Sequence, residues 1–164
     1  MLIPALVIGI SAWIIVRYYV KTEKEKLVVK IGLKNKEIIT PVRLQAYERV
    51  VLLLERMEAS QLVMRNVLIS QTAAQLQQSL VNNIREEFDH NLSQQLYISS
   101  EAWRLVKTAR ESAITAINNA AAKMAPDAPA SELAQIIFQE EVNAETSDIT
   151  NALEFLKSEA RLLF

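Results

Sequence analysis

The order of apolar and polar residues divides the chain into one uninterrupted apolar run and a series of amphipathic stretches. Residues 1–16 hold no charged side chain, and Arg17 is the first charge after them. A helix from Leu2 to Val20 rises about 28 Å, close to the thickness of the hydrocarbon core of a bilayer. The pattern therefore predicts a transmembrane anchor over residues 1–20.

A cleaved signal peptide is the alternative interpretation of this apolar run. A signal peptide has basic residues before its apolar segment and a small-residue cleavage site after it. Here only the amino terminus precedes the run, and Arg17, two tyrosines and several lysines follow it, so the flanks favour an uncleaved anchor. The residues expected at the membrane interface are Trp13, Arg17, Tyr18, Tyr19, Lys21, Lys24 and Lys26.

Lysines dominate the segment that follows the anchor. Residues 21–36 contain six lysines against Glu23 and Glu25, a net charge of +4. Because basic residues beside a membrane helix stay on the cytoplasmic side, we expect a single-pass protein of the bacterial inner membrane. Its N-terminus would lie outside and its C-terminal domain in the cytoplasm.

Residues 21–40 are predicted to form a basic juxtamembrane connector. Its β-branched segments, 27–31 and 37–40, could pair as a short hairpin or simply lie extended, although two strands alone are marginally stable. Pro41 suits the first turn of a helix, and Thr40 can cap that helix.

Residues 41–164 are predicted to form an all-α domain, an antiparallel helical hairpin or bundle. From Val42 to Ala125 the chain contains no glycine and no proline, which favours helix. Leu76, Leu80, Ile84 and Phe88 recur at four-residue spacing, and a heptad pattern from Trp103 to Met124 is broken only by Arg110. The expected helices cover residues 41–59, 72–92, 99–125 and 131–162, with a weak break at 58–61 before residues 62–69.

Charge is distributed unevenly along the chain. The net charge is −1 overall, but residues 1–36 sum to +5 and residues 125–164 to −6. This polarity suits a basic end held against anionic lipid, while a plain solvated face explains the acidic end equally well. Basic residues after position 41 alternate with acids, so we expect no nucleic-acid binding. There is no cysteine, which excludes disulfides and thiolate sites.

The single histidine, His90, stands in a Glu87-x-x-His90 pattern. Di-iron helical bundles use this spacing to place two ligands on one helix face. One histidine per chain would require a site shared across a homodimer, with Glu48 or Glu55 as further ligands, so the first shell is incomplete. A cationic histidine near a helix C-terminus explains the pattern more simply. We therefore expect no enzyme activity, no metal, no cofactor and no small-molecule substrate.

Two features are candidates for contact with a partner. Amide side chains are frequent between residues 71 and 95, a composition that suits hydrogen bonds across helix interfaces. The apolar stripe of the last helix is the stronger candidate, because its end has no polar residue after it. The predicted partner surface is Ile149, Leu153, Leu156, Leu163 and Phe164.

Two stretches resemble a known family. The segment Pro41-Val42-Arg43-Leu44-Gln45-Ala46-Tyr47-Glu48-Arg49, continued by 52–56, is one, and the segment 84–97 with Glu101-Ala102-Trp103 is the other. They resemble an uncharacterised single-pass membrane protein family of Bacteroidetes-type bacteria, over roughly residues 1–120. The resemblance implies the anchored architecture and the bacterial inner membrane, and it carries no activity.

The function expected from these features is a non-enzymatic, membrane-anchored helical scaffold or accessory subunit of an inner-membrane complex, acting through helix–helix contacts. Its partners would be the lipid bilayer and other subunits of the complex, or a second copy of itself. The alternatives are a self-assembling homo-oligomer on the membrane surface and a di-metal carboxylate enzyme shared across a dimer.

Overall fold

The described part of the chain is entirely helical apart from turns and connecting segments. The structure is a computed structural model that describes residues 2–143 and 146–163, without the side chains at 2–12, 14–15, 25, 27–29, 31–33 and 35–36. Within these residues it contains seven helices and no strand, only an isolated bridge between Thr72 and Pro129. The all-α prediction is confirmed.

The first helix, α1, runs without interruption from Leu2 to Met57 and contains Pro41. The hairpin or extended connector at 27–40 is therefore wrong, and so is a new helix beginning at Pro41. β-Branched residues lower helix propensity by only a fraction of a kcal/mol. Extending an existing helix is also easier than nucleating a second one. Proline lacks one N–H donor, a loss that this long helix tolerates.

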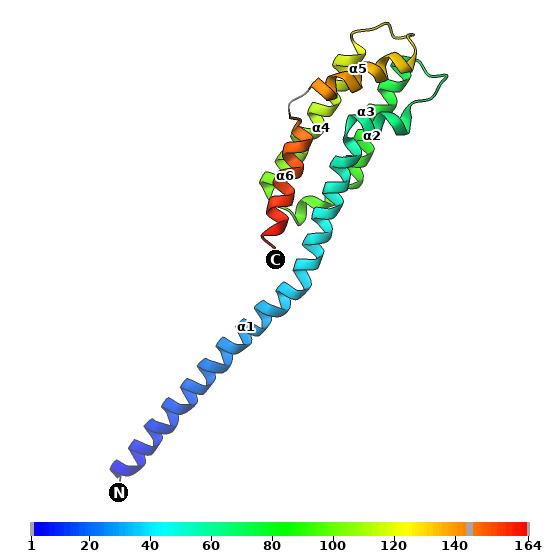
Figure 1. Ribbon diagram of the computed structural model, residues 1–164. Helices are drawn as coiled ribbons and strands as arrows, with labels where there is room; N and C mark the ends of the chain where they lie inside the picture. Colours follow the sequence, from blue (N-terminus) through cyan, green and yellow to red (C-terminus); the bar gives the residue numbers. More distant parts are fainter. Residues whose placement is uncertain (1, 144–145, 164) are drawn as a thin grey trace. The chain divides into compact units, whose positions relative to one another are not determined.

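The chain forms two compact units, residues 1–41 and residues 42–164, and each is described by itself. The first unit consists of α1 as far as Pro41. The second, here called the helical unit, contains the rest of α1 and all later helices (Figure 1). Those helices are α2 (Ala59–Asn66), α3 (Ala73–His90), the 3₁₀ helix η1 (Leu92–Leu96), α4 (Ser100–Ala121), α5 (Ala130–Asn143) and α6 (Asp148–Arg161).

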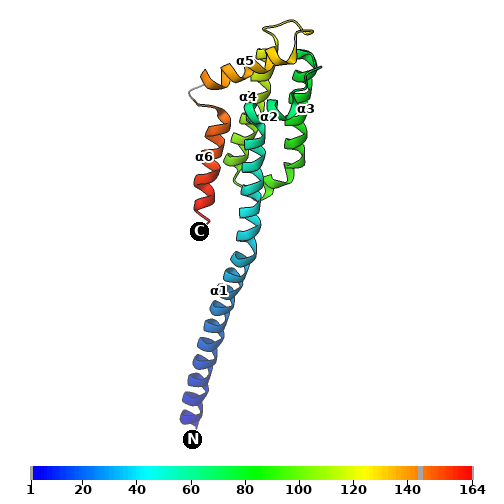
Figure 2. The same ribbon diagram turned by 45° about the vertical axis from the view of Figure 1, so that its right-hand side comes forward.

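Within the helical unit, α4 lies between α3 and α6 and runs antiparallel to both (Figure 2). Helices α3 and α4 contact each other at both ends. The Phe88 ring stacks on the Trp103 ring with 5.2 Å between the ring centroids, and the Gln77 side chain donates a hydrogen bond of 2.9 Å to the Asn118 side chain. Helix α5 crosses one end of the unit, where it packs on α2, α3 and α4. The predicted antiparallel helical bundle is therefore present in this unit.

The core of the helical unit is built from the stripes that the sequence pattern predicts. Leu76, Leu80, Ile84 and Phe88 of α3 are all buried. A buried leucine or isoleucine contributes about 1.5–3 kcal/mol relative to an exposed one, so these stripes supply much of the driving force for packing. The largest fully buried side chains are Tyr47, Leu53, Leu54, Met57, Leu62, Leu76, Leu80, Ile84, Leu133 and Leu156.

Hydroxyl side chains cap the N-termini of three helices. The Thr72 hydroxyl accepts from the Gln75 N–H, and the Gln75 side chain accepts from the Thr72 N–H, a reciprocal capping box. The Ser99 hydroxyl accepts from the Ala102 N–H at 3.0 Å, as expected for the third predicted helix. Ser147 caps α6 in the same way.

The predicted fourth helix over 131–162 is wrong as a single element. Helix α5 ends at Asn143, and α6 begins at Asp148. The Ser147 hydroxyl accepts from the Thr150 N–H at 3.0 Å, which satisfies a donor that a continuous helix would have used internally. The serine followed by an aspartate in the first turn is the local signal for this second start.

The break between α1 and α2 lies where the sequence suggests it, at Glu58. This residue has an extended backbone, with ψ of 135°. Arg65 of α2 links the two helices across this break. Its guanidinium donates hydrogen bonds to the Arg56 carbonyl of α1 at 2.7 Å and to the Gln61 carbonyl of α2 at 3.2 Å. One of the last carbonyls of α1, that of Arg56, is thus satisfied by a side chain from the next helix.

Candidate functional site

The residues predicted at the membrane interface are exposed along α1. Trp13, Tyr18 and Tyr19 are exposed, and the Arg17 guanidinium lies 4.7 Å from the Trp13 ring centroid. A cation placed over an indole face is favourable, and the pair lies one helical turn apart. The structure therefore places a Trp–Arg pair immediately before the two tyrosines on one helix.

Lys21, Lys24 and Lys26 follow on the same helix, and their side chains are exposed. Lys26 forms an ion pair with Glu23 at 3.1 Å, and such an exposed pair contributes little to stability. Over the residues whose side chains are described, no helix is both long enough and apolar enough to cross a membrane. Most side chains of the predicted anchor, residues 1–20, lie outside that description, and the anchor stays a prediction.

The predicted C-terminal partner surface needs correction. Ile149, Leu153 and Leu156 are 8%, 5% and 0% exposed, because they pack into the core of their own chain. Leu163 also packs against that core, and Phe164 lies outside the described residues. Helix α6 packs on α4, so Ile149, Leu153 and Leu156 are not free for a partner.

Several of the amide side chains also have partners within the chain. Asn66 of α2 accepts hydrogen bonds from Ser79 and Asn83 of α3, and Gln77 donates to Asn118 of α4. Gln94 is buried in η1. Gln77 and Asn83 thus join helices of the helical unit, a role within the chain itself.

The pattern Glu87-x-x-His90 has a structural explanation. Glu87 forms an ion pair with Arg56 of α1 at 2.7 Å, and His90 is exposed in the last turn of α3. Glu48 and Glu55 are exposed on α1. Among the described residues, no three histidine or acidic side chains are grouped so that they could hold a metal ion.

A polar cluster joins α1, the segment after η1 and α6. Arg43 donates to the Tyr97 carbonyl at 3.0 Å and to the Tyr47 hydroxyl at 3.5 Å. Ser99 donates to the Glu159 carboxylate at 2.9 Å. Burial raises the pKa of Tyr47, and the negative charge of Glu159 adds to this. The cluster fastens three segments of the helical unit, a structural role.

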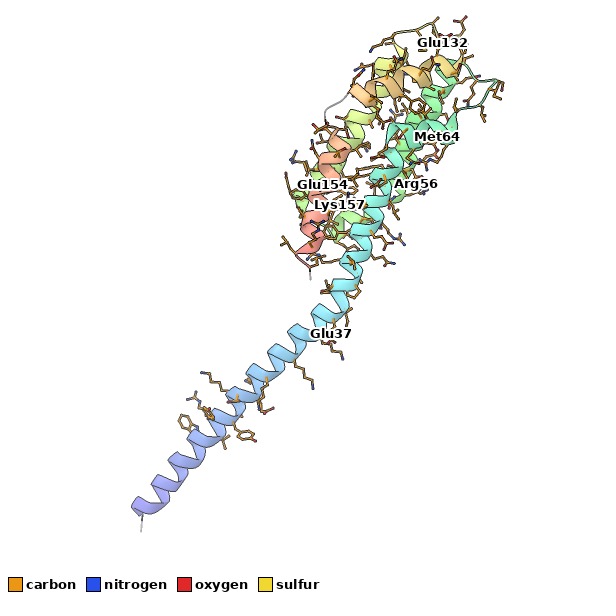
Figure 3. The ribbon with its side chains drawn as sticks, viewed as in Figure 1. Glu37, Arg56, Met64, Glu132, Glu154 and Lys157 are labelled. Carbon is orange, nitrogen blue, oxygen red and sulfur yellow. The ribbon has the colours of Figure 1, made fainter. Side chains whose placement is uncertain are left out.

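An apolar patch on the helical unit consists of Met64, Val67, Leu68 and Ile69, at the end of α2 and in the turn after it. Met64 is 75% exposed, Leu68 is 61% exposed and Ile69 is fully exposed. Figure 3 shows Met64 and Arg56 on the same side of the unit. The sequence marks the segment 62–69 only as one that follows a weak break. The fold buries Leu62 and Val63 and leaves Met64, Leu68 and Ile69 exposed.

The turn that carries the apolar patch is fixed by backbone hydrogen bonds. The Leu68 N–H donates to the Gln71 side chain at 3.1 Å, and the Gln71 N–H donates to the Leu68 carbonyl at 3.2 Å. The Ala130 N–H donates to the Gln71 carbonyl at 3.1 Å, which ties the base of the turn to the start of α5. The patch is therefore presented on an ordered scaffold.

A cavity of about 530 Å³ opens where α2, α4, α5 and the start of α6 meet. Its apolar lining includes Met57, Ile117 and Ile137, which are buried. Four carboxylates also line it: Glu58, Glu140, Glu141 and Asp148. Burial raises the pKa of Glu58, and the charges of Glu55 and Glu141 add to this effect.

The comparisons with known proteins identify a family. No curated protein and no solved structure matches the chain. A family model matches residues 1–163, which include both the N-terminal segment of α1 and the helical unit. The chain therefore belongs to this family, described as a family of unknown function (DUF7935).

Proposed function

We propose that this protein is a non-enzymatic, membrane-anchored helical scaffold or accessory subunit of a complex in the bacterial inner membrane. Residues 1–20 anchor it, with the N-terminus outside, and the helical unit works in the cytoplasm. The unit contacts its partner through helix–helix packing centred on the apolar patch.

One observation carries the proposal: an ordered turn exposes a run of large apolar side chains. Leu68 and Ile69 are exposed, whereas the apolar stripe of α3 and residues Ile149, Leu153 and Leu156 of α6 are buried. An exposed apolar cluster on a folded domain is typical of a site of protein contact. Because the turn is already ordered, binding would require little further loss of conformational entropy.

The sequence of interface residues on α1 supports the anchoring part of the proposal. Trp13 lies near the end of the apolar run, and its partner Arg17, two tyrosines and then lysines follow in the order expected at the cytoplasmic end of a membrane helix. Lysines near the surface also attract anionic lipid. These features concern the first unit alone and are independent of the apolar patch.

The test replaces Leu68 and Ile69 by serine in the full-length chain. After extraction of native membranes in mild detergent, native gel analysis should show the protein at a smaller complex size than the wild type. The matched control is Val142→Ser, since Val142 is 84% exposed but lies on α5, outside the patch. An unchanged complex for the double variant, with both variants folded, would contradict the proposal.

A further inference from the structure

We propose that the cavity between α2, α4, α5 and α6 binds a small organic cation with an aliphatic body, of the aliphatic polyamine class. This inference concerns a ligand site and is independent of the proposed scaffold role. It rests on the shape of the cavity, its apolar walls and the charges around it.

The cavity exists because α4 presents alanines where α5 and α6 separate. Ala109, Ala113 and Ala116 follow one another at spacings of four and three residues along α4, and all three line the cavity. Such small side chains leave space between α4 and the facing residues of α5 and α6, among them Ile137 and Ile149. The resulting volume, about 530 Å³, lies within the range of small-molecule sites.

The charges around the cavity select a cation. Glu140 is neutralised by an ion pair with Lys123. Glu58, Glu141 and Asp148 form no ion pair with any basic side chain whose position is described. Glu141 instead accepts from the Ser60 N–H at 3.4 Å, and Asp148 accepts from the Ser112 hydroxyl. The charge of Lys157 also acts on Glu58, but less than those of Glu55 and Glu141, and Lys157 is paired with Glu154. The three carboxylates thus leave a net negative charge.

The chemistry of the lining favours an organic cation over a metal ion. The described carboxylates are not grouped closely enough to coordinate a metal. The walls instead combine methyl and methylene groups, from Met57, Ile137 and Ile149 among others, with hydroxyls of Ser112 and Thr150. A ligand with ammonium groups on a flexible alkyl chain satisfies both parts, because its stem packs on apolar walls while its charges meet carboxylates.

The test measures binding of spermidine to the full-length protein in detergent by isothermal titration calorimetry. We expect saturable binding of one molecule per chain, and no binding of the neutral analogue 1,6-hexanediol. Glu141→Gln should weaken binding about tenfold, a loss of about 1.4 kcal/mol. Ala113→Phe, which fills the cavity, should weaken it at least as much. Circular dichroism checks that each variant is folded, and Glu141→Gln keeps the test valid if Ala113→Phe fails to fold.

The matched control is Glu132→Gln, which removes the same charge from an exposed position on α5 outside the cavity lining (Figure 3). It should leave the affinity unchanged. Absence of saturable binding to the wild type would overturn the proposal. So would an equal loss of affinity in Glu132→Gln and Glu141→Gln, because that pattern indicates attraction to the acidic surface in general.

Discussion

The guanidinium of Arg110 on α4 lies over the ring of Phe88 on α3, with 4.2 Å between its central carbon and the ring centroid. Phe88 in turn stacks on Trp103, so the arginine covers an aromatic pair between two antiparallel helices. Arg110 is also the residue that interrupts the heptad pattern of α4. In the fold, the Arg110 side chain covers the edge of the core, and its guanidinium forms an ion pair with Glu111 at the surface.

Replacing Arg110 should destabilise the helical unit through this contact. We expect Arg110→Ala to lower the free energy of unfolding by about 1–2 kcal/mol, and Arg110→Met to lower it less because the methionine retains an apolar stem. Urea unfolding of the full-length protein in detergent, followed by circular dichroism, measures both. Arg104→Met, at an exposed position of the same helix, is the control. Equal stability of Arg110→Ala and the wild type would show that the stacking contributes nothing.

Asn66 should contribute more to the free energy of unfolding than the exposed amide side chains near it. Asn66→Ala removes the acceptor for both Ser79 and Asn83, and we expect a loss of about 1–2 kcal/mol in the free energy of unfolding. Asn82→Ala, at an exposed position beside Asn83, should change stability little. The same urea titration compares them. If both variants lose the same stability, the Asn66 network is not what joins α2 to α3.

Ser147 stabilises the N-terminus of α6. Ser147→Ala removes the hydroxyl that accepts from the Thr150 N–H, and the unfolding free energy should fall by about 1 kcal/mol. Ser158→Ala is the control, because that hydroxyl lies within α6 and only donates to the Phe155 carbonyl of the preceding turn. A stability loss confined to Ser158→Ala would contradict the cap assignment.

Glu58 should make stability depend on pH. Its pKa in the folded protein is raised above the ordinary value of 4.5, mainly by burial and then by Glu55 and Glu141. The folded state therefore binds more protons, so this residue's contribution to stability decreases as the pH rises through its folded pKa. Glu58→Gln should be more stable than the wild type at neutral pH, and the difference should shrink as the pH falls towards about 4. Unfolding titrations between about pH 4 and pH 8 measure this difference in stability. If the advantage of Glu58→Gln over the wild type grows on acidification, the pKa of Glu58 is not raised by folding.

The proposed topology is tested by a reporter enzyme that is active only outside the cytoplasm. Fused after Phe164, it should be inactive, because in the proposed topology the lysines at 21–36 keep their end of the anchor on the cytoplasmic side. The same reporter fused to the N-terminus after its own export signal is the positive control. Activity at the C-terminal fusion would place the helical unit outside.

The amino-acid sequence by itself determined the helical fold and several helix limits. Thr72 and Ser99 mark helix starts because a cap is made between residues three positions apart, and this interaction needs no distant partner. The spacing of Leu76, Leu80 and Ile84 likewise determined which face of α3 would be buried. These features depend on local geometry, so a reading of the chain alone recovers them.

Only the tertiary structure decided which apolar surfaces are covered. The stripe of Ile149, Leu153 and Leu156 looks free in the sequence, but α4 covers it, whereas Leu68 and Ile69 remain exposed on their turn. The cavity cannot be predicted from the sequence either, because it forms where the alanines of α4 face residues of α5 and α6 that are distant in the chain. An amphipathic pattern indicates that one face of a helix must be covered. Which helix or protein covers that face depends on contacts between residues far apart in the chain.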